Sequence, residues 1–271
     1  MKISTLFLLF LAIFTSTATS KDAFPEAERS IASRIVGGQV ASVGQFPYVA
    51  AVHKVTSDGS YFCGGTLLNN EWVLTAGICV ESAISLVITL GTNTLKEETP
   101  NSLKLATDEY VLHPGFNPMT LDNDIGLIKF RMPITFTQYI RPVNYLPDFE
   151  LLPGTPGVVA MGWGQTSDKN PDLMNDLHYV YLTPLSNEEC ELFYGNIVTD
   201  QIVCAGGNYN EGFCMGDSGT PLVRLRQGPT STVVGVASFI SRKGCDNSDP
   251  SGYTRTLNFV DWIRNVTGME K

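Results

Sequence analysis

Residues 232–240 read Thr-Val-Val-Gly-Val-Ala-Ser-Phe-Ile, a short run of β-branched and small apolar residues that is typical of a buried strand. Runs of the same kind, cut by Gly, Pro and polar residues, recur along the chain. They occupy residues 48–52, 65–68, 72–75, 86–90, 125–130, 157–164, 178–182, 201–205 and 221–223. Many short strands with no long helical period between them predict an all-β barrel or sandwich.

The composition excludes several classes of protein. The chain has 271 residues, 43% of them hydrophobic and 17% charged, with 25 Gly, 15 Pro and 6 Cys. These values exclude a disordered tail, a collagen-like fibre and a small disulfide knot. The net charge of -9 argues against a general attraction to nucleic acid or to an anionic membrane.

The first 34 residues have the pattern of segments that are removed. Residues 1–20 combine Lys2, an apolar run over 6–14 and small residues at 18–20, which predicts a secretory signal peptide. The apolar run is too short to span a bilayer, which needs about 20 such residues. Residues 21–34 are polar and end at Arg34, so we expect a pro-segment, and residues 35–271 form the mature, secreted protein.

Cysteine usage agrees with an extracellular protein. Six cysteines in an oxidising compartment favour disulfides over metal ligation. The sequence contains no CxxC pair and no HExxH, and we expect neither a metal nor a cofactor.

The last part of the chain carries a helical pattern. Asn258 is a candidate N-cap with Asp261 three residues later, which predicts a helix over about 258–267. An apolar stripe at helical spacing would dock it on the protein; its members are Phe259, Trp262, Ile263 and Val266. Asn265-Val266-Thr267 is a possible N-glycosylation sequon, and such sequons are used in some proteins and left empty in others.

Six motifs follow one another in the order and spacing of one family. They are Ile35-Val36-Gly37-Gly38 after Arg34, Leu74-Thr75-Ala76 before Cys79, Asp122-Asn123-Asp124-Ile125-Gly126-Leu127, Gly162-Trp163-Gly164, Gly216-Asp217-Ser218-Gly219, and Pro250-Ser251-Gly252-Tyr253-Thr254-Arg255. The chain resembles the chymotrypsin-like (S1) serine peptidases, and its features are most similar to those of invertebrate secreted members.

The resemblance implies a two-part architecture. It implies two six-stranded antiparallel β-barrels, about 35–150 and 151–255, with the active site in the cleft between them and the change-over in Pro142–Pro156. It also implies a monomer and three disulfides. The implied pairs are Cys63 with Cys79, Cys190 with Cys204, and Cys214 with Cys245.

Carried over residue by residue, the resemblance also implies an active site. Ser218 takes the nucleophile position, Asp124 the orienting carboxylate, and Ser238 the serine that bonds to that carboxylate. The backbone amides of Gly216 and Ser218 would form the oxyanion hole. Ile78 stands where the family has its catalytic histidine.

That departure bears directly on function. A serine hydroxyl needs a positioned base to take its proton, and the base must later protonate the leaving amine. Isoleucine has no lone pair and no titratable proton. The three histidines of the chain are His53, His113 and His178, and the resemblance places none of them near Ser218. The sequence therefore predicts a proteolytically inactive protein that is not an enzyme.

Other implied positions are kept or altered. The activation switch is present as Arg34, Ile35 and Asp217, because cleavage before Ile35 would free an α-amino group for the carboxylate. The specificity pocket falls on Gly212, Ser238, Ile240 and Ser251, which favours apolar side chains. Two further departures flank the site, and they are either harmless or disturbing to it: Gly77 replaces an alanine and Thr220 a glycine.

These expectations support three functions. The first is a secreted, inactive peptidase homologue that binds or regulates proteases, protease inhibitors or protease substrates. The second is a weak serine endopeptidase of chymotrypsin-like apolar specificity, with water or the substrate supplying the base. The third is a protein whose outer loops bind carbohydrate or microbial surfaces, which nothing in the sequence selects.

Overall fold

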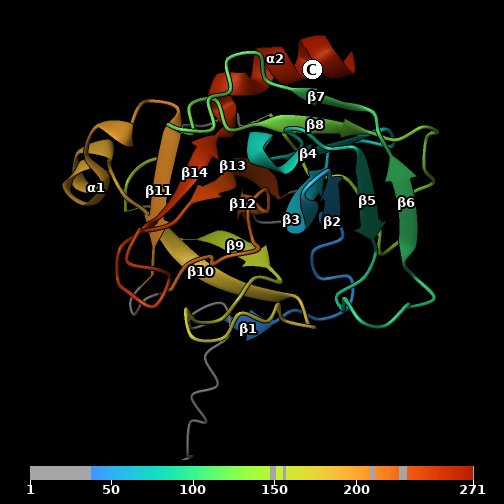
Figure 1. Cartoon of the computed structure of the whole chain (residues 1–271), viewed down its shortest axis with the longest axis horizontal. Helices are drawn as coiled ribbons and strands as arrows, with labels where there is room; N and C mark the ends of the chain where they lie inside the picture. The colour runs from blue at the N-terminus through green and yellow to red at the C-terminus, as the bar shows by residue number, and fades with distance from the viewer. Residues whose placement is uncertain (1–37, 147–150, 155–156, 208–210, 226–230, 271) are drawn as a thin grey trace, which may run out of the picture. The chain divides into compact units, whose positions relative to one another are not determined.

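The computed structural model describes residues 38–146, 151–154, 157–207, 211–225 and 231–270 (Figure 1). The chain divides into two units, residues 1–31 and 32–271, and every described residue belongs to the second. The predicted signal peptide, the pro-segment, Arg34 and Ile35 therefore lie outside the described residues.

The first antiparallel sheet has the order β6-β5-β2-β3-β4-β8-β7 and curls into a half-barrel (Figure 1). Its strands are β2 (Val49–Thr56), β3 (Gly59–Leu67), β4 (Trp72–Thr75), β5 (Ser85–Leu90), β6 (Leu103–Thr107), β7 (Tyr110–Leu112) and β8 (Gly126–Lys129). The two edge strands, β6 and β7, are separated in the chain only by Asp108 and Glu109. One bent segment thus supplies both edges, and this forces the sheet to curl.

The second sheet is a closed barrel of six strands. Its strands are β9 (Val158–Gly162), β10 (His178–Pro184), β11 (Ile202–Gly206), β12 (Pro221–Arg224), β13 (Thr232–Phe239) and β14 (Ser251–Arg255). Closure is complete because β9 pairs with both β10 and β12. The short strand β1 (Gln39–Val40) pairs with His178 and Tyr179, the first two residues of β10. A segment from the N-terminal part of the chain thus joins the C-terminal sheet.

The predicted all-β, two-part fold is confirmed. Strand β4 has the predicted bounds, and β13 differs from its prediction by one residue. Strands β1, β6, β7 and β14 were not predicted. Gln39–Val40 has two residues, Leu103–Thr107 contains Lys104, Tyr110–Leu112 has three residues, and Ser251–Arg255 contains Gly252. None of the four has the long apolar run that marks a strand in sequence.

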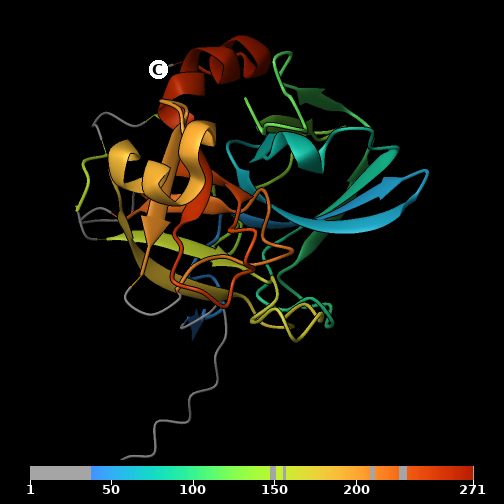
Figure 2. The ribbon, with the colours of Figure 1, turned by 60° about the vertical axis from the view of Figure 1, so that its left-hand side comes forward.

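The helices differ from the prediction. The C-terminal helix α2 (Val260–Thr267) starts two residues late, because a 3-10 turn over Thr256–Phe259 precedes it. Asn258 is not the cap, since its side-chain amide donates to the carbonyl of Asp200. A second helix, α1 (Asn187–Tyr194), was missed, and a capping box of Ser186 and Glu189 begins it. Figure 2 shows α1 beside the second barrel and α2 at the end of the chain.

Three disulfides and an extensive core hold the fold together. The bonded pairs are those that the resemblance implies: Cys63–Cys79, Cys190–Cys204 and Cys214–Cys245. The apolar face of α2 packs on the larger core through Phe259, Trp262, Ile263 and Val266, as the stripe predicts. In the described part of the chain, none of the helices has the length and apolar character needed to cross a membrane.

Candidate active site

The loop that carries Ser218 is held in a sharp turn. Gly216 and Gly219 have φ angles of 96° and 85°, a region that L side chains rarely adopt. A Cβ on Gly219 would lie 2.2 Å from Oγ1 of Thr75, so glycine is required there for space as well. The Ser218 carbonyl accepts from the Gly64 amide at 2.8 Å, and this bond ties the loop to the first sheet. Ser218 itself is half-buried.

A hydrogen bond orients the peptide unit that joins Met215 and Gly216. The carbonyl of Met215 accepts a hydrogen bond from the Gln165 amide at 2.9 Å. In a trans peptide the C=O and N–H point in opposite directions, so the Gly216 N–H points away from Gln165. This orientation leaves the Gly216 amide able to donate to an oxyanion beside Ser218, together with the Ser218 amide.

Asp124 is buried, and both oxygens of its carboxylate accept hydrogen bonds. Its Oδ2 accepts from the Ser238 hydroxyl at 2.6 Å, and its Oδ1 accepts from the Ile78 amide at 2.9 Å. The Thr254 hydroxyl donates to its main-chain carbonyl at 2.8 Å, which links the carboxylate segment to β14. Burial raises the pKa of Asp124 to about 6, against the opposing effect of these hydrogen bonds.

Ile78 contacts Asp124 through its backbone. It lies in a 3-10 turn over Gly77–Cys79, and its side chain is half-buried and packs on the larger core. The carboxylate that would orient an imidazole at this position accepts from the backbone amide of residue 78. The structure therefore brings Ile78, Asp124 and Ser238 together, as the resemblance implies.

The three histidines make their contacts elsewhere. The His53 ring packs edge-on against Phe62, and the His113 ring packs against Trp262 of α2. His178 is buried in β10, where its Nδ1 contacts the carbonyl of Asp176 at 2.7 Å.

The two departures beside the site have structural causes. A Cβ on Gly77 would lie 2.9 Å from the Phe116 ring, so this ring occupies the space that an alanine needs. The Thr220 methyl group lies 2.1 Å from where a Cβ on Gly64 would be, so it fills the gap over that glycine. Thr220 does not have a positive φ, so its side chain causes no backbone strain.

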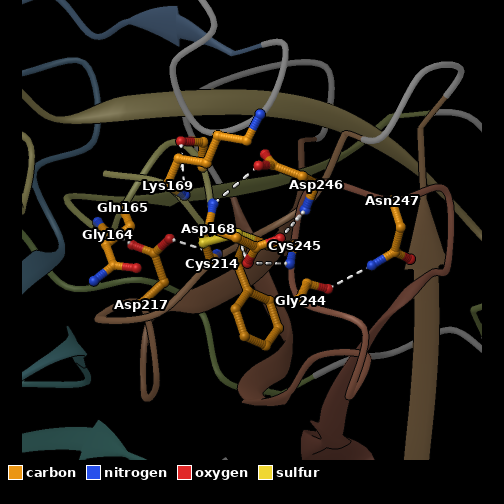
Figure 3. Close-up of a disulfide and its surroundings, with 12 residues drawn as sticks. Gly164, Gln165, Asp168, Lys169, Cys214, Asp217, Gly244, Cys245, Asp246 and Asn247 are labelled. Carbon is orange, nitrogen blue, oxygen red and sulfur yellow. Dashed lines mark hydrogen bonds between the residues drawn. A yellow bond between two sulfur atoms is a disulfide. The ribbon is translucent and has the colours of Figure 1, made fainter. Parts of the chain in front are cut away.

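The Asp217 carboxylate is buried, and backbone amides and two glycines lie close around it. Its Oδ1 accepts from the Gly164 amide at 2.7 Å and its Oδ2 from the Cys214 amide at 3.1 Å (Figure 3). A Cβ on Gly162 or Gly164 would lie within 2.5 Å of the carboxylate, which explains both glycines around Trp163. Burial raises the pKa of Asp217 to about 6.

Next to Asp217, the Cys214–Cys245 disulfide joins the Ser218 loop to the loop of Cys245, and Asp168 ties a third loop to that of Cys245 (Figure 3). The Asp168 carboxylate accepts from the amides of Cys245 and Asp246, and the Asp246 carboxylate accepts from the Asp168 amide. Asp168 and the two cysteines also form a cluster of possible metal ligands among the described residues. The two sulfurs are bonded to each other, so they offer no thiolate to a metal.

The specificity-pocket positions lie together in the second barrel. The Ser251 hydroxyl accepts from the Phe213 amide at 3.3 Å and lies 2.5 Å from where a Cβ on Gly212 would be. Ile240 packs on the buried cluster that contains Phe213. Sequence reasoning missed Phe213, whose ring stands 5.2 Å from that of Tyr253. The sequence signal that could have pointed to Phe213 is its position directly after Gly212, which the resemblance places in the specificity pocket.

The sequon lies on α2. Asn265 is exposed, while the Thr267 hydroxyl donates to the carbonyl of Ile263 at 2.7 Å. The side chain of Asn265 is therefore reachable on the folded surface.

A curled half-barrel and a closed barrel, with a serine on a glycine-bounded loop and a buried carboxylate, define a protein of the serine peptidase class. The family model described as Trypsin matches residues 35–263, and the chain belongs to this trypsin-like serine peptidase family.

Named relatives cover nearly the whole chain. Brachyurin of Leptuca pugilator is 34% identical over 87% of this chain and 99% of its own length. Chymotrypsin-like elastase family member 1 of Bos taurus is 32% identical over 96% and 98%. The solved structure of HL collagenase matches with a TM-score of 0.76 and 32% identity, covering 87% of this chain and 99% of that chain.

These matches correct one expectation. The prediction that the chain is not an enzyme rested chiefly on Ile78, and it is wrong, because the relatives carry the names of endopeptidases and align over almost their full lengths. The comparisons therefore point to an enzyme.

Proposed function

We propose that the chain is a secreted serine endopeptidase of low turnover that cleaves peptides beside apolar side chains. Ser218 is its nucleophile, and the amides of Gly216 and Ser218 bind the oxyanion. The observation that carries the proposal is the bond between the Met215 carbonyl and the Gln165 amide, because it turns the Gly216 amide away from Gln165 and so supports a role for that amide as an oxyanion donor.

The low turnover follows from residue 78. Ile78 cannot accept the proton of Ser218, so water or a group of the substrate takes it, and proton transfer loses the benefit of a positioned base. In an unrelated serine protease, loss of the base lowers turnover by about 10^6, while the oxyanion hole and substrate binding retain a residual rate. In this proposal the Asp124 carboxyl is ionised at neutral pH, because its pKa of about 6 is lower than 7.

The substrate is a protein or peptide segment with an apolar side chain at the cleavage position. Gly212 provides no charge for a basic side chain, and Ile240 narrows the entrance with its branched Cβ. Phe213 adds apolar bulk in the same buried cluster. These features favour shape selection with modest affinity.

Activation follows cleavage after Arg34 in this proposal. The new α-amino group of Ile35 would pair with Asp217, a carboxylate that is buried and bonded to amides of Gly164 and Cys214. An added cation at this carboxylate stabilises the ordered loop next to Ser218. Residues 1–20 act as the signal peptide, and the three disulfides suit an oxidising compartment.

A binding role is the second candidate, and the half-buried Ile78 beside the nucleophile loop favours it. When cleavage is slow, a bound peptide leaves mainly by dissociation, so the chain acts chiefly as a binder of that peptide. Such a protein could regulate proteases, their inhibitors or their substrates while it retains weak catalysis.

The test is turnover by the cleaved chain. The chain is cut after Arg34, the Ile35 N-terminus is verified, and peptides with Phe, Ala or Arg at the cleavage position are offered. We expect slow cleavage of the apolar peptides that Ser218→Ala abolishes. Cleavage of equal rate in Ser218→Ala, or preference for Arg, contradicts the proposal.

A further inference from the structure

Lys54 brings a buried ammonium to the main chain of residue 78. It lies on β2 and exposes 8% of its surface, although lysine is seldom buried without a carboxylate partner. Its Nζ donates to the carbonyl oxygen of Ile78 at 2.8 Å and lies 5.8 Å from the centre of the Tyr61 ring. Glu81 is the carboxylate whose charge acts on it, and burial lowers the pKa of Lys54.

Residue 78 is thus held on both sides of its Cα. Its amide donates to the Asp124 carboxylate at 2.9 Å, and its carbonyl accepts from the Lys54 ammonium at 2.8 Å. The two bonds belong to the two planar peptide units that meet at this Cα. Fixing both units fixes φ and ψ of residue 78, and with them the direction of its Cα–Cβ bond, from which the side chain extends. Bonds to charged groups are also stronger than neutral ones.

We propose that Lys54 is a positioning residue of the active site, which fixes the side chain of residue 78 relative to Ser218 by holding the residue 78 carbonyl. This inference rests on the proposed endopeptidase function. It adds a residue from β2 to a site otherwise built from the Gly77–Cys79 turn, Asp124 and the loop of Ser218.

The energetics of Lys54 suit positioning better than support of the fold. A buried ammonium loses its hydration, and one carbonyl and one aromatic ring replace only part of it. The paired residue on the neighbouring strand β5 is Leu86, which is fully buried, so an apolar side chain would suit the surroundings of Lys54. Replacing a buried charge by an apolar residue of similar size is often neutral or stabilising. Lys54→Met should therefore keep the melting temperature or raise it, while it frees the carbonyl of residue 78.

The experiment compares Lys54→Met with the matched control Lys129→Met in the cleaved chain. The Lys129 ammonium also lies over an aromatic ring, 5.6 Å from the centre of Trp72, but it belongs to β8. The first readout is hydrogen exchange of the amides of residues 77–79, and the second is the rate at which a fluorophosphonate labels Ser218. The third is turnover in an Ile78→His background, in which an imidazole reports the position of the side chain.

We expect Lys54→Met to speed the exchange of these amides and, in the Ile78→His background, to slow labelling of Ser218 by about tenfold or more. In the Ile78→His background it should lower kcat by a similar factor and leave KM unchanged, because substrate contacts are not altered. Lys129→Met should change none of the three. Lys54→Gln, which keeps an N–H donor, should fall between the parent and Lys54→Met.

Several results would overturn the inference. Unchanged exchange and unchanged kcat in Lys54→Met refute it, and the proposed function then stands if the Ile78→His parent turns over substrate. Loss of folding in both Lys54→Met and Lys54→Gln also refutes it, because the lysine is then structural. If neither the native chain nor Ile78→His reacts at Ser218, the proposed function fails, and exchange at residues 77–79 alone decides the role of Lys54.

Discussion

At the scale of single residues, the proposed chemistry depends on which side chain residue 78 carries. Asp124 is already bonded to the Ser238 hydroxyl and the residue 78 amide, so the support for an imidazole is in place. Ile78 leaves this support without a base. In the proposed site, residue 78 is therefore the position at which the base is lacking.

Ile78→His should raise the turnover of the cleaved chain. A histidine at this position gains the Asp124 carboxylate as its orienting partner and takes the proton of Ser218. We expect kcat to rise by about 10^3 or more, up to the order of 10^6 that a lost base costs elsewhere. The measurement is steady-state hydrolysis of a Phe-containing peptide, with Ile78→Leu as the control. No gain would mean that the Ser218 loop or the groove is not competent.

The sequence and the structure differ most at residues whose environment contradicts their type. Asp124 and Ser238 could be predicted from the family motifs, and the structure brings them within 2.6 Å. Lys54 could not be predicted, because a lysine in an alternating strand is normally expected on the solvent face. The reason for a glycine at position 77 could not be predicted either, because the Phe116 ring, which fills the space of a Cβ there, comes from a segment distant in sequence.

At the scale of elements, α1 shows that a local signal can be present and still be overlooked. The helix has only eight residues and little apolar periodicity, so hydrophobic pattern does not reveal it. The pair Ser186 and Glu189 has the spacing of a capping box, and both of its hydrogen bonds form at the start of α1. Asn258, in contrast, is predicted to cap the C-terminal helix. In the structure it lies in the 3-10 turn before α2, so it is not at the cap position.

Ser186→Ala should destabilise the protein through α1. The substitution removes the hydroxyl that accepts from the Glu189 amide at 3.1 Å. The expected loss in the free energy of unfolding is about 1 kcal/mol. Urea denaturation measures it, and Ser186→Asp, which keeps an acceptor, should restore most of the loss. A value near zero would show that α1 forms without its cap.

Ile263→Ala should lower the free energy of unfolding more than Ser186→Ala, because α2 is held on the larger core by apolar packing. Ile263 is fully buried in the larger core beside Phe259. Loss of the side chain leaves a cavity, and the expected destabilisation is about 2–5 kcal/mol. Denaturation again measures it, and exposed Leu257→Ala is the matched control, for which we expect little change.

At the scale of the whole molecule, two buried carboxylates make stability depend on pH. Burial raises the pKa of both Asp124 and Asp217 to about 6, above the ordinary aspartate value of 3.8. Between these values the folded chain binds more protons than the unfolded chain. Stability from these groups is therefore greatest at low pH, falls as pH rises from about 4 to 6, and is level above that.

Asp217→Asn should weaken this pH dependence in the uncleaved chain. We expect the difference in unfolding free energy between about pH 4.5 and pH 7 to shrink by on the order of 1–3 kcal/mol. Cleavage after Arg34 should also reduce it in the parent, because pairing with the Ile35 α-amino group lowers the pKa of Asp217. Urea titrations at the two pH values measure both effects. An identical pH dependence before and after cleavage would contradict the activation switch.

The central claim is that Ser218 is a working but slow nucleophile. The most direct measurement is mass spectrometry of the cleaved chain after incubation with a fluorophosphonate, with the modified peptide sequenced. The account predicts a single adduct on Ser218 that forms slowly, forms faster in Ile78→His and is absent from Ser218→Ala. No adduct on Ser218 in either the native chain or Ile78→His would contradict it.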